Sequence, residues 1–250
     1  MKFIPTTLAQ RKKYYQFQFD QKKVFDWFKK NKISPPQLCA LDMGSETKII
    51  LDKKKMGKLI NFIPRHLQQK LIETLPEDVY YDRNRYTDPK VALKKLAFKE
   101  SFSDLNFLGQ ELAFDIDANN FDCSCIDVCE KCIAKSQRNS LKVGKKLEEH
   151  FSRIGYVYSG RGMHVHVFDK RAFSLSIKER QDINTTMRSF GIDPWVSRGR
   201  IRLMRLPFSL NGLVSRIVVP LSADEVETFN PLTDKRTIPT YSSSASSFLS

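Results

Sequence analysis

The segment at the centre of this chain reads Glu111-Leu-Ala-Phe-Asp-Ile-Asp117. Its apolar residues alternate, and because side chains two residues apart share one face of a strand, the pattern predicts a β-strand. Asp115 and Asp117 then point the same way from that strand. Two adjacent carboxylates repel each other unless a cation lies between them, and hard divalent cations take oxygen ligands. The pair therefore indicates either a divalent-cation site or a strand face that is simply solvated.

The composition of the chain favours a polyanionic partner. Of the 250 residues, 42 are Lys or Arg and 28 are Asp or Glu, which gives a formal net charge of +14. Such an excess favours nucleic acid over a membrane surface, although a lysine-rich proteome would produce the same charge. No apolar run is long enough to span a bilayer, and Met1-Lys2-Phe3 does not begin a signal peptide. We therefore expect a soluble intracellular protein with no membrane contact.

Hydrophobic spacing and turn residues divide the chain into helices and strands. Pro89 at the first helical position after Asp88, and Gly191 after a periodic segment, mark one helix start and one helix end. We predict helices at about 21–31, over 53–75 with a break at Pro64, from Asp88 onward, at 137–153 and at 176–190. We predict strands in a hairpin over 37–51, in two runs within 156–168, at 201–206 and at 216–219.

A short segment after the central strand is rich in cysteine. Cys123, Cys125, Cys129 and Cys132 place four thiols in one compact loop. Structural zinc prefers a closed tetrahedral site of this kind, and an iron–sulfur cluster is the chemical alternative. Binding a metal would fold a loop that has almost no apolar core of its own. Cys39 stands apart and is predicted to be a small buried hydrophobic residue.

A glycine-rich turn lies between the two strands predicted within 156–168. It reads Ser159-Gly-Arg-Gly-Met-His-Val-His166. The glycines permit a tight turn and let an anion approach the backbone. Ser159 and Arg161 can donate to phosphate oxygens, and Arg does so with a bidentate fork. The segment is either a phosphate-binding turn or an ordinary glycine-rich hairpin with histidines by chance.

A later segment combines a carboxylate with several arginines. Asp193 precedes Pro194, and arginines follow at positions 198, 200, 202, 205 and 216. A third Asp would complete a cation site that two carboxylates cannot fully enclose. The arginines would then balance the charge of phosphate groups.

Taken in order, these motifs resemble the small catalytic subunit of archaeo-eukaryotic DNA primases, over most of the chain from about Pro76 onward. Phe114-Asp-Ile-Asp117 resembles the Asp-x-Asp motif of that family, and the four cysteines resemble its zinc-binding insert. Residues 159–164 are similar to its Ser-Gly…Arg-Gly-x-His nucleotide motif. The remaining similar segments are Pro76–Tyr81, Arg85–Pro89, Ile192-Asp193 and the run from Arg202 to Ser209.

The resemblance implies an α+β fold, with a mixed β-sheet flanked by helices and a small zinc-binding insert. It implies a nucleotidyltransferase, namely a DNA-dependent primase that synthesises short primers on a single-stranded template. Asp115, Asp117 and Asp193 would be catalytic and hold two Mg²⁺ or Mn²⁺ ions. Cys123, Cys125, Cys129 and Cys132 would hold a structural Zn²⁺. The residues implied in nucleotide binding are Ser159, Gly160, Arg161, His164, Arg202 and Arg205.

The resemblance also implies partners and an organisation of the chain. The partners are single-stranded DNA, nucleoside triphosphates and a large subunit with an iron–sulfur domain, either separate or fused. The catalytic domain would cover residues 1–239, with the zinc loop at about 121–134, and the Ser-rich residues 240–250 are predicted to be a disordered tail. The location would be the cytoplasm for an archaeal-type protein and the nucleus in a eukaryote.

Two alternatives stay open on the same scaffold. One is a non-catalytic, zinc-stabilised nucleic-acid-binding module. It is favoured by Asn211-Gly212-Leu213, which stands where the family usually has His-Gly-Lys. The other is a repair or gap-filling primase-polymerase of the same superfamily, and initiation without a primer would separate the two polymerase activities.

Overall fold

The structure is a computed structural model that describes residues 4–44, 59–95, 106–117, 120–121, 128–199 and 201–242. Its helices are α1 (Leu8–Lys13), α2 (Gln21–Lys30), α3 (Leu67–Thr74), α4 (Pro89–Lys95), α5 (Glu130–Leu147), α6 (Lys170–Phe173), α7 (Ile177–Met187), α8 (Pro194–Ser197) and α9 (Ala223–Thr228). Shorter turns are a π-helical turn at Tyr14–Gln18 and 3₁₀ turns at Arg188–Phe190, Lys235–Thr237 and Thr240–Ser242. Within these ranges, no helix is long and apolar enough to cross a membrane.

The strands of the described part are β1 (Cys39–Asp42), β2 (Ile60–Phe62), β3 (Asp78–Asp82), β4 (Asn84–Tyr86), β5 (Phe107–Gln110), β6 (Leu112–Asp117), β7 (Ile154–Tyr158), β8 (Gly162–Val167), β9 (Leu203–Arg205), β10 (Leu210–Asn211), β11 (Arg216–Ile217) and β12 (Val219–Leu221). One sheet has the order β12-β7-β8-β6, and a second has the order β11-β10-β3-β1-β2 with β9 also paired to β3. The β4 and β5 strands form a separate ribbon.

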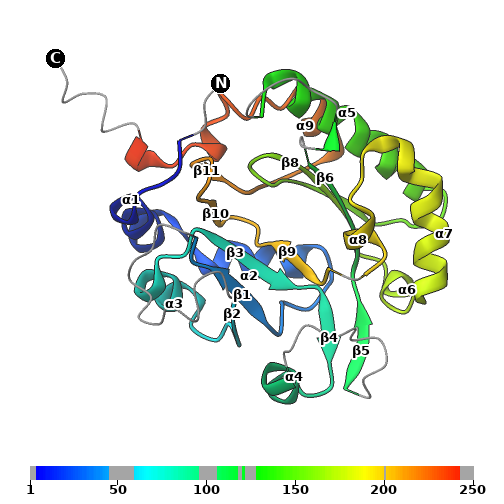
Figure 1. The fold of residues 1–250 in the computed structure, drawn as a ribbon, viewed down its shortest axis with the longest axis horizontal. Coiled ribbons are helices and arrows are strands. Elements are labelled where there is room, and N and C mark those ends of the chain that lie inside the picture. Colours follow the sequence, from blue (N-terminus) through cyan, green and yellow to red (C-terminus); the bar gives the residue numbers. More distant parts are fainter. Residues whose placement is uncertain are drawn as a thin grey trace.

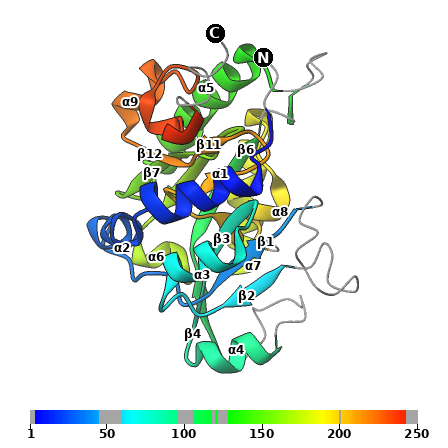
Figure 2. The ribbon, with the colours of Figure 1, turned by 90° about the vertical axis from the view of Figure 1, so that its left-hand side faces the viewer.

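Helices cover the sheets on their outer sides. Figure 1 shows α5 and α7 beside the β6–β8 sheet, and α1 and α3 beside the sheet that contains β3. The β4–β5 ribbon and α4 lie at the end of the molecule opposite α5 and α9 (Figures 1 and 2). Apolar residues of both sheets form one large buried cluster, to which β6 contributes Leu112, Phe114 and Ile116. That cluster holds the two sheets together and fixes the strand that carries the Asp-x-Asp pair.

Local sequence explains how several helices start and stop. Thr7, Ser176 and Ser222 form capping boxes that begin α1, α7 and α9. Asp88 accepts hydrogen bonds from the backbone of the first turn of α4, as its position before Pro89 predicts. Gly191 has φ +71°, a left-handed conformation that ends the turn after α7. The predicted helix at 176–190 and its stop are confirmed.

Three sequence-based expectations differ from the structure. The implied mixed sheet is wrong for the described residues. Every strand pairing among them is antiparallel. Within the helix predicted over 53–75, α3 is the one described segment that is helical. Ile60–Phe62 forms β2 and pairs with β1, and Pro64 lies between β2 and α3. The helix predicted over 137–153 runs from Glu130 to Leu147, and its first two turns bury Cys132, Ile133 and Ser136.

The predicted tail begins with residues that pack against the domain. Tyr241 is buried, and the Thr240 N–H donates to the Gln18 side chain at 2.9 Å. These residues form the last 3₁₀ turn rather than a disordered segment. The prediction for 243–250 lies outside the described residues, as do residues 45–51 of the hairpin predicted over 37–51.

Candidate active site

The β6 and β8 strands bring the Asp-x-Asp pair beside the glycine-rich turn. In their antiparallel register, Asp115 faces His164 and Asp117 faces Gly162. The His164 Nε2 atom lies 3.7 Å from an oxygen of the Asp115 carboxylate. A Cβ atom at Gly162 would lie 2.4 Å from the carbonyl oxygen of Ile116, so only glycine lets the strands approach this closely at Asp117. The sequence pattern that places both carboxylates on one face is confirmed.

Asp193 reaches the same place from a distant part of the chain. Its backbone N–H donates to the carbonyl oxygen of Asp115 at 2.8 Å, which attaches the start of α8 to β6. The carboxylates of Asp115, Asp117 and Asp193 line one cavity of about 200 Å³. The Asp193 carboxylate also caps α8, because it accepts a hydrogen bond from the Trp195 N–H at 2.8 Å.

The charge of Asp115 is disfavoured in this cavity. Burial is the largest cause, followed by the neighbouring carboxylates of Asp117 and Asp193, and together they raise the pKa of Asp115 to about 7. Clustered acids of this kind need a counter-charge to be ionised together. Among the described residues, no three His, Cys, Asp or Glu side chains stand close enough together to hold a metal ion as they are.

The glycine-rich turn beside β6 also lines the cavity. The Gly162 N–H donates to the Ser159 hydroxyl at 3.2 Å, and the Ser159 N–H donates to the Gly162 carbonyl at 3.0 Å. Gly160 has φ +101°, which favours glycine at the tip of the turn. Ser159 and Arg161 both line the cavity, so the turn presents a hydroxyl and a guanidinium toward the carboxylates.

Arg205 supplies a second positive charge from the other sheet. It lies opposite Tyr80 in the β3–β9 pairing, and its guanidinium is 5.2 Å from the centre of the Tyr80 ring. It is ion-paired with Asp78. Burial works against its charge, but Asp78 more than compensates and raises the pKa of Arg205 above its usual value. Arg205 is therefore a fixed cation within the cavity.

His164 is neutral at physiological pH. Burial first, and then the nearby His166 and Arg205, lower the pKa of His164 well below its usual value. Its Nδ1 atom has no hydrogen-bond partner among the described residues. A neutral imidazole keeps one N–H donor and one acceptor, so His164 can bind a polar ligand group without adding charge.

The chain has clear relatives. Residues 114–194 match the family described as DNA primase small subunit. A protein of Archaeoglobus fulgidus, named an uncharacterized DNA primase small subunit-like protein, is 33% identical, and the match covers 91% of this chain and 88% of that protein. This chain belongs to the DNA primase small subunit family. The membership supports a primase or polymerase type of function, and thus a nucleotidyltransferase in general.

Other members of the family align over shorter segments. The DNA primase small subunit PriS of Pyrobaculum calidifontis is 27% identical over 64% of this chain and 65% of its own length. PriS of Pyrococcus abyssi is 34% identical over 41% of this chain and 32% of its own length. Among solved structures, the polymerase domain of Mycobacterium tuberculosis Ligase D in complex with DNA matches with a TM-score of 0.49 and 12% identity, over 97% of this chain and 93% of that chain.

The structure brings together most of the site residues that the sequence suggested. The cavity is lined by Asp115, Asp117, Asp193, Ser159, Arg161, His164 and Arg205. Gly160 forms the turn behind Ser159. Arg202 is not at the cavity, because it is ion-paired with Asp82 and donates to Asn61 on the neighbouring strand.

Two of the four cysteines of the expected zinc loop are described. Cys129 precedes α5 and Cys132 lies in its first turn, with their sulfur atoms 3.5 Å apart. Two thiolates on one tetrahedral zinc ion lie about 3.8 Å apart, given the usual Zn–S distance. The pair therefore fits half of such a site. Cys123 and Cys125 lie outside the described residues, and the isolated Cys39 is buried in the core as the sequence predicted.

Two residues that line the cavity, Tyr80 and Asn211, were not among the site residues predicted from the sequence. Tyr80 and Asn211 reach the cavity through the pairing of β3 with β9 and of β3 with β10. Asp78 is found only through its contact with Arg205. Alternation within β3 could have placed Asp78 and Tyr80 on one face, but nothing in the sequence states which strands flank β3.

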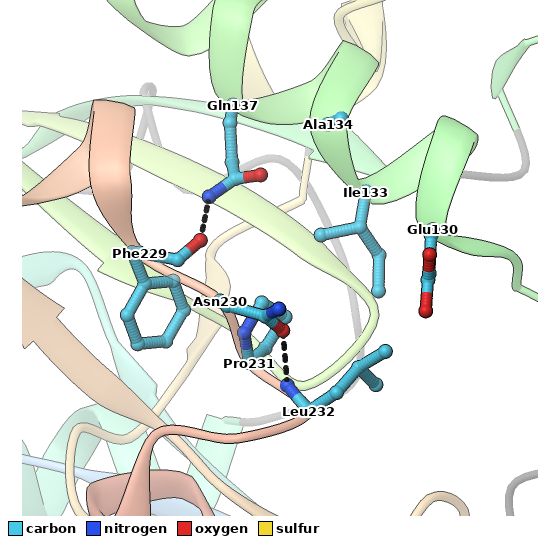
Figure 3. Close-up of a pocket in the computed structure, with 8 residues that line it drawn as sticks. All are labelled: Glu130, Ile133, Ala134, Gln137, Phe229, Asn230, Pro231 and Leu232. Atoms are coloured by element: carbon cyan, nitrogen blue, oxygen red, sulfur yellow. Dashed lines mark hydrogen bonds between the residues drawn. The ribbon is translucent and has the colours of Figure 1, made fainter.

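A second pocket lies away from this site, between the start of α5 and the segment after α9. Figure 3 shows that Gln137 of α5 donates to the Phe229 carbonyl, at 2.6 Å, while Ile133 and Leu232 contribute apolar walls. Its only titratable lining residue is Glu130. The pocket therefore lacks the grouped charges of the acidic cavity, and Gln137 there joins α5 to the end of α9.

Proposed function

We propose that this protein is a DNA-dependent primase, which synthesises short primers on single-stranded DNA by two-metal nucleotidyl transfer. The observation that supports this most is the meeting of acidic and phosphate-binding groups in one cavity. Asp115 and Asp117 come from β6, Asp193 precedes α8, and Arg161 and Arg205 come from two further segments. Family membership supports the same reaction type.

The acidic groups suit Mg²⁺ or Mn²⁺ in their chemistry. Asp115, Asp117 and Asp193 would hold two such ions, since carboxylate oxygens are the ligands these cations prefer. Burial, and then the carboxylates of Asp117 and Asp193, raise the pKa of Asp115, so a bound cation would favour its ionised form. When bound, the ions would activate the attacking 3′-hydroxyl and neutralise the triphosphate.

The other side chains of the cavity would hold the incoming nucleotide. Arg161 and Arg205 would bind its phosphate oxygens, and the Ser159 hydroxyl and a neutral His164 would donate further hydrogen bonds. Arg205 is held in place by Asp78 and Tyr80, so little ordering is needed when phosphate binds. Catalysis of this kind is mostly positioning and electrostatic stabilisation.

The remaining parts of the proposal concern partners and the zinc ion. The net charge of +14 would attract the backbone of a single-stranded DNA template. A structural Zn²⁺ would be held by Cys129 and Cys132 together with Cys123 and Cys125. A large subunit with an iron–sulfur domain would be the protein partner.

A primer-synthesis assay tests the proposed function. The full-length protein is incubated with single-stranded DNA, labelled nucleoside triphosphates and Mn²⁺. We expect Asp115→Asn and Asp117→Asn each to lower product formation at least about a hundredfold, because each removes a carboxylate that would hold the metal ions. Asp26→Asn serves as the control, since Asp26 is exposed on α2 in a surface ion pair.

The same assay separates the alternatives. DNA binding without any metal-dependent synthesis would select the non-catalytic module, which Asn211 and Leu213 in place of the usual His and Lys favour. Extension of a supplied primer without new initiation would select a gap-filling polymerase. Synthesis by both Asp variants at the wild-type rate would contradict the proposed site altogether.

A further inference from the structure

The side-chain oxygen of Asn211 is a buried acceptor with no hydrogen-bond partner among the described residues. Asn211 ends β10, is 1% exposed, and lines the acidic cavity. Its side-chain nitrogen donates to the Ser159 carbonyl at 3.0 Å. Because the nitrogen must face that carbonyl, the orientation of the amide is settled, and Oδ1 is the atom left without a partner.

The surroundings of Asn211 keep this side chain in place. Its backbone pairs with Asp78 of β3 on one side and with Arg216 of β11 on the other. Gly160 packs directly against the amide, since a Cβ atom there would lie 2.6 Å from Nδ2. Burying an acceptor without a hydrogen-bond partner destabilises the folded protein. That cost is offset when a ligand in the cavity donates to the oxygen.

If the protein binds a nucleotide in this cavity, as the proposed function requires, few groups of that nucleotide can donate a hydrogen bond to Asn211 Oδ1. Phosphate oxygens at neutral pH only accept hydrogen bonds, so the triphosphate cannot satisfy Oδ1. The donors on the base edge pair with the template and differ among the four bases. The sugar hydroxyls are donors that all four nucleotides share. We propose that Asn211 accepts a hydrogen bond from a sugar hydroxyl of the incoming nucleotide, and so selects nucleotides by their sugar.

Single-nucleotide addition to a primer annealed to a template tests this proposal. The value of kcat/KM is measured for a ribonucleotide, for the 2′-deoxynucleotide and for the 3′-deoxynucleotide, with Mn²⁺. The wild type should use one of the two deoxy forms about three- to tenfold less well, which is the effect of one neutral hydrogen bond. The form that is disfavoured identifies the hydroxyl that Asn211 recognises.

The Asn211→Ala variant should lose that discrimination. Its kcat/KM should fall for nucleotides that carry the hydroxyl and stay nearly unchanged for the form that lacks it. Asn139→Ala is the matched control, because Asn139 is a buried Asn of α5 that donates to the Phe190 carbonyl away from the cavity. It should keep the wild-type sugar preference.

Two results would overturn the proposal while leaving the proposed function intact. The first is that the wild-type protein adds all three nucleotides equally well, and this can be measured without any variant. The other is an equal loss for all three in Asn211→Ala, which would mean that Asn211 only supports the Ser159 turn. A wild type that adds no nucleotide at all would overturn both the proposal and the proposed function.

Discussion

Asp115 shows how much a single side chain depends on its neighbours. Its pKa is raised from an ordinary value of 3.8 to about 7, chiefly by burial and then by Asp117 and Asp193. Between these two pKa values, the folded protein keeps a proton that the unfolded chain has lost. The free energy of unfolding of the metal-free protein should therefore fall as the pH rises from about 4 to about 7.

Asp115→Asn removes this charge and should stabilise the metal-free protein by about 1–3 kcal/mol at pH 8, with little effect at pH 4. Urea unfolding followed by tryptophan fluorescence in magnesium-free buffer at both pH values measures the difference. The same gain at both pH values would show that packing, rather than charge, is responsible.

Single residues were predictable from sequence where local pattern determined their direction. Alternation within the segment 111–117 was enough to place Asp115 and Asp117 together. The roles of Arg202 and Arg205, both in the later arginine-rich segment, could not be distinguished in this way. Arg205 reaches the cavity while Arg202 pairs with Asp82, and that division depends on how β9 docks beside β3.

At the scale of elements, a buried cluster joins the two sheets behind the cavity. Glu111 directly precedes β6, and its carboxylate lies 2.6 Å from His166 of β8 and accepts from the Tyr81 hydroxyl of β3 at 2.9 Å. All three side chains are fully buried. Burial is the largest single influence on the pKa of Glu111 and would raise it. Contacts with the neighbouring side chains, first of all the hydrogen bond with His166, outweigh burial and lower the pKa.

Removing this carboxylate charge should loosen the junction of the sheets. We expect Glu111→Gln to lower the free energy of unfolding by about 1–3 kcal/mol, because one of the two carboxylate oxygens in contact with Tyr81 and His166 becomes an N–H donor. Asp26→Asn breaks the exposed pair with Lys22 and should cost less than about 1 kcal/mol. Chemical denaturation of both variants tests this, and equal losses would contradict a buried ionic junction.

Elements were predictable where their own residues contained the start and stop signals. The helix after Asp88, the helix that ends at Gly191 and the hairpin around Ser159 all follow from caps and glycines. Ile60–Phe62 had a helical spacing with later residues, yet it pairs as a strand with β1. Tertiary pairing overrides local periodicity in such short segments, and the sequence does not contain that information locally.

At the scale of the whole molecule, the fold gathers one site from segments that are far apart in the chain. The Asp-x-Asp strand lies in one sheet, Arg205 comes from the other, and Asp193 is attached to β6 by a backbone hydrogen bond. No single element holds more than part of the cavity. The order of the motifs in the sequence suggested that these residues form one site. The pairing of β9 with β3 and of β6 with β8 brings them together in the structure.

The most direct measurement is a crystal structure of the protein soaked with Mn²⁺ and a nucleoside triphosphate, with the metal located by its anomalous scattering. We predict Mn²⁺ in the acidic cavity with Asp115 and Asp117 as ligands, and with the Asp193 carboxylate bound to at least one ion. No Mn²⁺ in the cavity, or an Asp193 carboxylate that still contacts only the α8 backbone, would contradict the account.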